Sequence, residues 1–176
     1  AEAAACAGLS LGELTSLVAA GAIDCFDAVR LVRRRGELME DASLKNPGRM
    51  ASIIGLSLQD LKDVCGESGC EIANLNCPGQ IVISGAKDNL ARAATLAKDK
   101  GARRAIPLPV SGAFHTPLMQ PAADGLSRVI ADLAFHQPLI PIIANTSAQP
   151  LTTAEQVKEE LLAQLCHGIQ WQRSIE

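Results

Sequence analysis

The strongest constraint on the fold of this chain is the run Gly8–Gly12, which reads Gly-Leu-Ser-Leu-Gly with Ser10 at its centre. A G-x-S-x-G run forms a nucleophile elbow when it follows a strand and opens a helix. Residues 3–7 are small and apolar, as in a buried strand end, and apolar residues then recur with helical spacing at Leu11, Leu14, Leu17 and Val18. We expect both glycines to be needed, because a Cβ would clash in the turn. The helix N-terminus would favour negative charge developing at Ser10, although a serine that only caps a helix gives the same pattern.

The composition argues against two kinds of partner. Among 176 residues there are one Trp, three Phe and no Tyr, so aromatic platforms for stacking bases are scarce. The net charge of -3 gives no attraction for a phosphate backbone, and we expect no nucleic-acid partner. No apolar run has the length needed to cross a membrane, and we expect no membrane partner.

The cysteines do not form a recognisable metal or disulfide pattern. Six are scattered along the chain without paired C-x-x-C spacing, which is atypical of a zinc site or a disulfide framework. We therefore expect reduced thiols, in the cytoplasm or the stroma of a plastid.

The two ends of the sequence suggest that the chain is a fragment. It does not begin with Met, it starts almost on the strand before Ser10, and it stops without a terminating signal. Any targeting segment would lie outside it, so the absence of one has no meaning here.

A second helix is predicted from about residue 25 to residue 42, with Asp24 as its cap. We expect its core face to carry Phe26, Val29, Val32, Leu38 and Met39. Arg30 and residues 33–35 make a cationic cluster on the same helix. Because consecutive helical residues point about 100° apart, one of the three arginines at 33–35 should turn inward.

Residues 48–110 have a pattern of their own. A strand at 50–55 is followed by a helix capped by Ser57, two strands joined by Pro78-Gly79, an Ala-rich helix at 86–100 and a last strand at 103–110. Pro107 and Pro109 restrict that last strand to an edge position or a short length. The order β-α-β-β-α-β is the ferredoxin-like arrangement, so we predict a small subdomain at 48–110 inserted between residues 1–47 and 111–176 of a larger one.

Residues 111–176 return the chain to the larger subdomain. Thr116 and Pro117 are expected to begin a helix that runs to about Ala134. Residues 138–145 are apolar enough for a strand inside a parallel sheet, and Thr153 caps a helix over 154–166. The chain is therefore predicted to be an α/β protein.

A serine nucleophile needs a base, and His115 is the best candidate among three histidines. His136 lies in a polar turn, and His167 lies near a helix C-terminus, where a cation is favourable in any case. His115 stands where the chain re-enters the larger subdomain, beside small residues that leave room for a reaction. No carboxylate near it suits a triad, since Asp124 and Asp132 are distant, so an amide or a backbone carbonyl would have to orient its ring.

These residues resemble the malonyl-CoA:acyl-carrier-protein transacylase family of fatty-acid synthesis, over all 176 residues. The resemblance rests on five ordered blocks, which are Gly8–Glu13, Val29–Val32 with Arg35–Met39, Asn76–Gly85, Pro107–His115, and Gln164-Leu165 with Gln170-Trp171. It implies an α/β-hydrolase-like core with a parallel sheet and a ferredoxin-like insert.

The resemblance also implies a role for each candidate residue. Ser10 would be the acylated nucleophile and His115 its general base, with the ring oriented by the carbonyl of Gln164. Arg35 would bind the free carboxylate of the malonyl group, and the backbone N–H of Leu11 would be one oxyanion donor. The implied substrates are malonyl-CoA and acyl-carrier protein, and no cofactor is implied.

The sequence departs from the common family pattern in two respects. The residue before the serine is Leu9, where most members have His; this variant resembles plastid-type members. The family's N-terminal Gly-Gln segment, which gives the second oxyanion donor, and its C-terminal part are absent. We therefore expect low transfer activity from this chain.

Three alternatives remain open from the sequence. An acyltransferase domain of a polyketide synthase or large fatty-acid synthase would use the same chemistry in a longer chain. A serine thioester hydrolase would share Ser10 and His115, but it has no need of Arg35 and usually has an acidic triad member. A non-catalytic module with a vestigial elbow would have no use for Ser10, Arg35, His115 and Gln164 together, because buried polar groups are costly.

Overall fold

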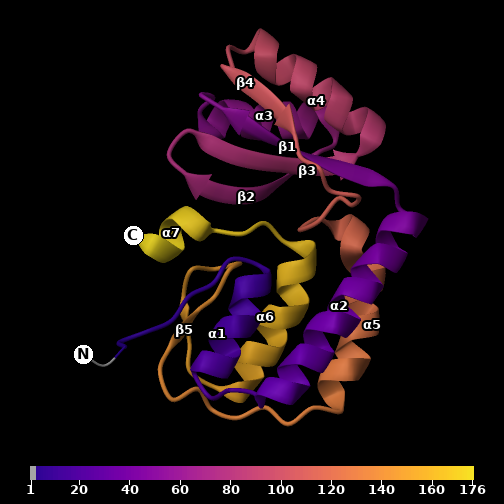
Figure 1. The fold of residues 1–176 in the computed structure, drawn as a ribbon. Helices are drawn as coiled ribbons and strands as arrows, with labels where there is room; N and C mark the ends of the chain where they lie inside the picture. The colour runs from indigo at the N-terminus through magenta and orange to yellow at the C-terminus, as the bar shows by residue number, and fades with distance from the viewer. Residues whose placement is uncertain (1–2) are drawn as a thin grey trace.

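A computed structural model describes residues 3–176, which form two units stacked one above the other (Figure 1). The sheet unit comprises residues 48–110, and the helical unit comprises residues 3–47 and 111–176. The short helix α7 (Trp171–Ile175) lies between the units, against the edge strand of the sheet (Figure 1).

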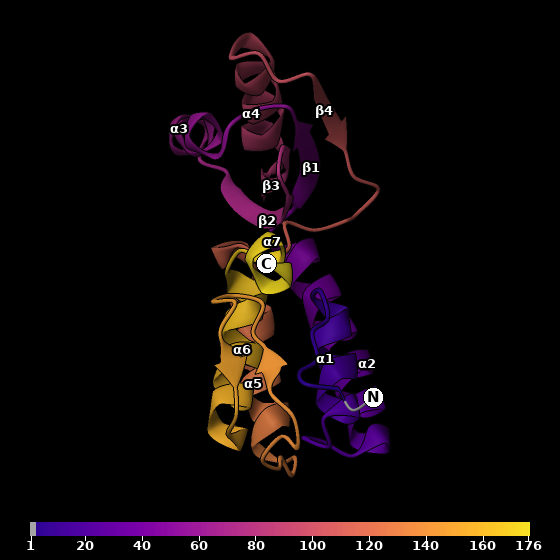
Figure 2. The same cartoon turned by 90° about the vertical axis from the view of Figure 1, so that its left-hand side faces the viewer.

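The sheet unit has the predicted order β-α-β-β-α-β. Its elements are β1 (Gly48–Ile54), α3 (Leu58–Ser68), β2 (Glu71–Cys77), β3 (Gln80–Ala86), α4 (Lys87–Asp99) and β4 (Arg104–Pro107). The four strands lie in the order β2-β3-β1-β4, every neighbouring pair is antiparallel, and β4 is at an edge, as its prolines predict. Both helices cover the face of the sheet that is turned away from the helical unit (Figure 2).

Local sequence signals account for these boundaries. The Ser57 hydroxyl accepts a hydrogen bond from the backbone N–H of Asp60 and caps α3. Gly69 ends that helix with φ 76°, and Gly79 has φ 78° in the hairpin turn between β2 and β3. Both positions need positive φ, which glycine adopts without a steric penalty.

The helical unit is built from packed helices around one apolar core. Its elements are α1 (Leu11–Ala19), α2 (Cys25–Lys45), the 3-10 turn η1 (Pro117–Met119), α5 (Gln120–Ala131) and α6 (Ala154–Cys166). As predicted, Asp24 and Thr153 cap α2 and α6, and Thr153 forms a capping box with Gln156. The helix expected to run to Ala134 instead begins with a 3-10 turn and ends at Ala131.

The predicted core face of α2 is partly wrong. Phe26 and Val29 are 78% and 64% exposed, whereas Ala28 and Leu31 are buried together with Leu38 and Met39. The buried positions are the ones turned toward α5 and α1, and the predicted face was rotated because it followed the largest apolar side chains. Hydrophobicity alone does not define the face of a helix when exposed positions are also apolar.

The parallel sheet predicted for the larger subdomain does not form among residues 3–176. In the predicted strand 138–145, only β5 (Ile142–Ile143) is a strand, and it pairs antiparallel with β6 (Pro150–Leu151). The one parallel contact at β5 is an isolated bridge between Ile142 and Cys6. Pro138 and Pro141 lack the backbone N–H that a longer ladder would need.

The two units are connected where the chain passes from one to the other, and also by hydrogen bonds between their backbones. The backbone N–H of Leu75 donates to Ile169 O at 2.8 Å, and the N–H of Ile169 donates to Ala73 O at 2.8 Å. Gly168 precedes this contact, and a Cβ there would meet Ile72 O at 2.3 Å. The segment that follows α6 therefore forms an isolated parallel bridge with β2.

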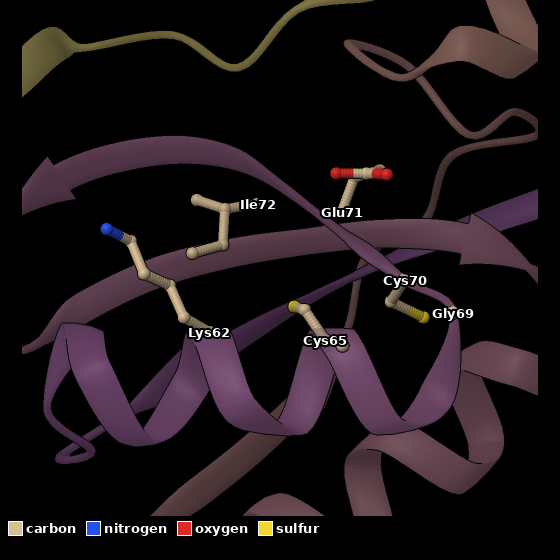
Figure 3. A pocket seen from close by; sticks show the side chains of 7 residues that line it. Lys62, Cys65, Gly69, Cys70, Glu71 and Ile72 are labelled. Atoms are coloured by element: carbon tan, nitrogen blue, oxygen red, sulfur yellow. The ribbon is translucent and has the colours of Figure 1, made fainter.

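The sheet unit carries a surface hollow of about 500 Å³ between α3 and β2, lined by Lys62, Cys65, Cys70, Glu71 and their neighbours (Figure 3). Burial raises the pKa of the Cys65 thiol to about 12, so this thiol stays protonated and unreactive near neutral pH. All six cysteines are free thiols. No helix within residues 3–176 combines the length and the apolar character needed to cross a membrane.

Candidate active site

Ser10 stands on a strained turn immediately before α1. Its φ of 52° and ψ of -100° place it in a sparsely populated backbone region, as a nucleophile elbow requires. A Cβ at Gly8 would lie 2.1 Å from Gly12 O, so the first glycine of the motif is required. A Cβ at Gly12 would meet nothing within 4 Å, and the expectation that both glycines are sterically required is wrong for the second.

The elbow is held by Asn145, a residue that the sequence analysis did not single out. The backbone N–H of Ser10 donates to Asn145 Oδ1 at 2.6 Å, and Asn145 Nδ2 donates to Gly8 O at 2.8 Å. One fully buried amide therefore fixes both sides of the strained turn. In the sequence, the only indication of a role for Asn145 was its position at the end of the predicted strand 138–145.

Arg35 is the arginine of the cluster that turns inward, as the helical geometry predicts. It is 6% exposed, whereas Arg33 and Arg34 lie on the surface and form ion pairs with Glu37. Arg35 Nη2 donates to Ser10 Oγ at 3.0 Å and to Gln164 Oε1 at 2.8 Å. Its buried Nε has no partner among the described residues, so the guanidinium keeps donor capacity beside the serine.

His115 is buried, and one of its ring nitrogens is fixed. His115 Nδ1 lies 2.7 Å from the backbone carbonyl oxygen of Gln164. Because a carbonyl can only accept, Nδ1 carries the proton and Nε2 keeps a lone pair. Burial is the main cause that lowers the pKa of His115 to about 4, so the ring is neutral at ordinary pH.

Within the described chain, no hydrogen bond joins His115 to Ser10, whose hydroxyl accepts from Arg35 instead. A cavity of about 210 Å³ borders His115 at the junction of the two units, with Glu71, Gln120, Cys166 and His167 among its lining residues. The other two histidines are exposed, and within residues 3–176 neither forms a hydrogen bond with Ser10.

Gln164 links the three groups. Besides the contacts to Arg35 and His115, its Nε2 donates to Ser10 O at 3.1 Å and to a carboxylate oxygen of Glu13. Glu13 is fully buried, and burial raises its pKa to about 8, while burial lowers the pKa of Arg35 to about 10. Glu13 closes the Gly8–Glu13 block, but no role for it was predicted from the sequence.

The backbone N–H of Leu11 lies at the start of α1, where helical amides have no partner within the helix. No acceptor among residues 3–176 bonds to it. A helix N-terminus next to a serine hydroxyl favours negative charge there. Residues 3–176 contain no group of three or more metal-ligating side chains.

The comparison with known proteins agrees with this geometry. The sequence profile of the family described as "Acyl transferase domain" matches residues 1–174. The malonyl CoA-acyl carrier protein transacylase of Bacillus subtilis is 47% identical over 174 residues, which are 96% of this chain and 55% of that protein. The chain thus spans about half the length of the curated relatives it matches, and the resemblance inferred from the sequence is confirmed.

Solved structures give the same result. A crystal structure of an acyl carrier protein S-malonyltransferase from Vibrio cholerae matches with a TM-score of 0.94 and 42% identity, covering 97% of this chain and 57% of that one. A malonyl-transacylase solved in complex with a type II polyketide synthase acyl-carrier protein matches with a TM-score of 0.94 and 39% identity, covering 97% and 57%.

Proposed function

The chain belongs to the acyl transferase domain family, and on that basis we propose that it transfers a malonyl group from malonyl-CoA to the phosphopantetheine thiol of an acyl-carrier protein in fatty-acid synthesis. The transfer passes through a malonyl ester of Ser10. The observation that carries this proposal is the buried guanidinium of Arg35, 3.0 Å from the serine hydroxyl.

In the first half of the reaction Ser10 Oγ attacks the thioester carbonyl, and Nε2 of His115 takes its proton. The carbon–sulfur bond then breaks, and CoA leaves as a thiol with the proton from His115. The Leu11 N–H stabilises the oxyanion that forms on the carbonyl oxygen. The neutral ring and the Nδ1 hydrogen bond to Gln164 O support His115 as the base.

The second half runs in reverse with a different thiol. His115 takes the proton of the carrier-protein thiol, the thiolate attacks the serine ester, and Ser10 recovers its proton from His115. Between the two halves the malonyl carboxylate pairs with Arg35, whose planar guanidinium can bind it with two hydrogen bonds. An acetyl group has no carboxylate and would leave a buried cation unpaired, so it is disfavoured.

We further propose that residues 48–110 are a ferredoxin-like subdomain inserted into an α/β-hydrolase-like core made by residues 1–47 and 111–176. Strand order β2-β3-β1-β4 and the parallel bridge from Cys6 to Ile142 support this division. An acyltransferase of polyketide synthesis would use the same site, and one of the matching structures is such a transacylase with its carrier protein.

The test is the mass of the intact protein after brief exposure to malonyl-CoA or to acetyl-CoA. We expect the wild-type protein to form a malonyl adduct and Ser10→Ala to form none. Arg35→Ala should form an acetyl adduct in preference to a malonyl adduct. Arg33→Ala is the control, because it removes an exposed arginine from the same helix. Release of CoA without an adduct would indicate a thioester hydrolase. If the protein forms no adduct and also releases no CoA, that result would contradict acyl transfer by this chain.

A further inference from the structure

A buried carboxylate that the transfer reaction does not use lies behind the site. Glu13 is on α1, three residues after the serine, and no part of it reaches solvent. One of its oxygens accepts a hydrogen bond from the backbone N–H of Asn145 at 2.8 Å, and the other accepts from Gln164 Nε2. Such a group is costly to bury unless its charge is balanced.

Arg35 is a buried cation in the same hydrogen-bond network, and the amide of Gln164 stands between the two side chains. Its Nε2 donates to Glu13, and its Oε1 accepts from Arg35 Nη2 at 2.8 Å. A guanidinium can only donate, and both Glu13 oxygens accept from N–H groups, so the two ends fix the orientation of the amide. The same Nε2 also donates to Ser10 O, which reinforces that orientation.

We propose that Glu13 is a positioning residue that holds the Arg35 guanidinium at Ser10 through the Gln164 amide, and so sets the preference for an acyl group with a free carboxylate. This inference rests on the proposed malonyl transfer. Glu13 does not contact the reacting atoms; its two oxygens accept from Asn145 N–H and from Gln164 Nε2, and so keep Gln164 Oε1 facing Arg35. The Coulomb attraction between the two groups lowers the pKa of Glu13 and raises that of Arg35, which opposes the larger effect of burial on each.

Glu160 offers a matched control. It is also a buried glutamate, on α6, but its oxygens accept from the N–H and the hydroxyl of Thr146, at 2.8 Å and 2.6 Å. A hydroxyl can accept as well as donate, so Gln at 160 can keep both hydrogen bonds. Both partners of Glu13 are N–H groups, so Gln at 13 must place its amide hydrogens against one of them.

The first measurement is the single-turnover rate of acyl-serine formation from malonyl-CoA and from acetyl-CoA. In Glu13→Gln we expect the malonyl rate to fall about tenfold or more while the acetyl rate changes much less, because a hydrogen bond to a charged group is weakened. Glu160→Gln should keep the wild-type ratio of the two rates. An unchanged ratio in a folded Glu13→Gln protein would overturn the proposal, since a merely structural role lowers both rates together.

The second measurement does not need activity. Urea unfolding of Glu13→Gln, Arg35→Gln and the double variant forms a double-mutant cycle. We expect the double variant to unfold at a higher urea concentration than the sum of the two single shifts predicts. Each single variant leaves one end of the Gln164 hydrogen-bond chain in place without the other, whereas the double variant removes both ends. The cycle of Glu160→Gln with Arg35→Gln should be additive.

An additive Glu13–Arg35 cycle would contradict the proposal whether or not a malonyl adduct forms. If Glu13→Gln alone does not fold, recovery of folding on adding Arg35→Gln supports the proposal, and no recovery contradicts it. A wild-type protein that forms no malonyl adduct would contradict the proposed function alone, and the cycle would still decide the role of Glu13.

Discussion

The caps and turns of the sheet unit and the polar centre of the helical unit obtain their hydrogen bonds from very different distances along the chain. In the sheet unit, caps and turns bond residues two to four positions apart, and the β2–β3 hairpin closes over Pro78-Gly79. In the polar centre, Asn145 and Gln164 bond to Ser10 across 135 and 154 residues. The chemistry therefore depends on contacts that exist only once the whole helical unit has formed.

This difference indicates where each unit is vulnerable. A substitution at a cap or a turn of the sheet unit removes a local interaction and leaves the neighbouring ones in place. A substitution in the polar centre leaves buried donors or acceptors without partners, which costs more than the bond itself contributes. The predictions below test that contrast.

The largest effect is expected for Asn145→Ala, which removes the clamp of the elbow. The backbone N–H of Ser10 and Gly8 O would lose their partners, and two unsatisfied buried groups cost about 4 kcal/mol together. We expect the acylation rate to fall about a hundredfold, since Ser10 would leave its strained conformation. Urea unfolding and adduct formation measure the two effects. Asn89→Ala, which removes one exposed bond to Gly69 O, is the control and should change stability by less than about 0.5 kcal/mol.

The contrast also explains what could be predicted from the sequence. Ser57, Asp24, Thr153 and the β-α-β-β-α-β order follow from local signals, and the inward turn of one arginine in 33–35 follows from helical geometry. Asn145 and Glu13 were missed because their role depends on partners more than 130 residues away. The buried face of α2 was misjudged because Phe26 is apolar but has nothing to pack against.

The second prediction concerns pH and Glu13, which faces Arg35 on α2 and Glu160 on α6. Its pKa is raised from 4.5 to about 8, so its contribution to stability is present below pH 4.5 and is lost as the pH rises through 8. The pKa of His115 is lowered from 6.5, so its titration changes the stability only below pH 6.5. Between pH 6.5 and 9 the comparison of wild type with Glu13→Gln therefore reports on Glu13. We expect the unfolding free energy of wild type to fall by roughly 2 kcal/mol relative to that of Glu13→Gln as the pH rises through this window. A constant difference in unfolding free energy across that window would show that burial does not raise this pKa.

The third prediction concerns the contact between the two units. In Gly168→Ala the new Cβ would meet Ile72 O at 2.3 Å, and backbone on both sides must move. We expect a loss of about 2 kcal/mol in stability, the usual cost of overpacking, and slower acylation because α6 also carries Gln164. Gly66→Ala is the control, since a Cβ at this exposed helical site meets nothing within 4 Å, and it should be neutral or stabilising. Equal melting temperatures for the two variants would contradict a tight contact between the segment that follows α6 and β2.

The smallest effect is expected for Ser57→Ala in the sheet unit. The substitution removes the hydroxyl that caps α3 and leaves the exposed N–H of Asp60 to water, so the cost is about 1 kcal/mol. Ser127→Ala is a matched control, because that hydroxyl only donates to Asp124 O within α5 and its loss should be almost neutral. Ser57 has no connection to the network around Ser10, so the malonyl adduct should form at the wild-type rate in a folded Ser57→Ala protein. Acylation slowed as much as in Asn145→Ala would mean that the sheet unit and the polar centre form a single cooperative network, and the contrast between them would not hold.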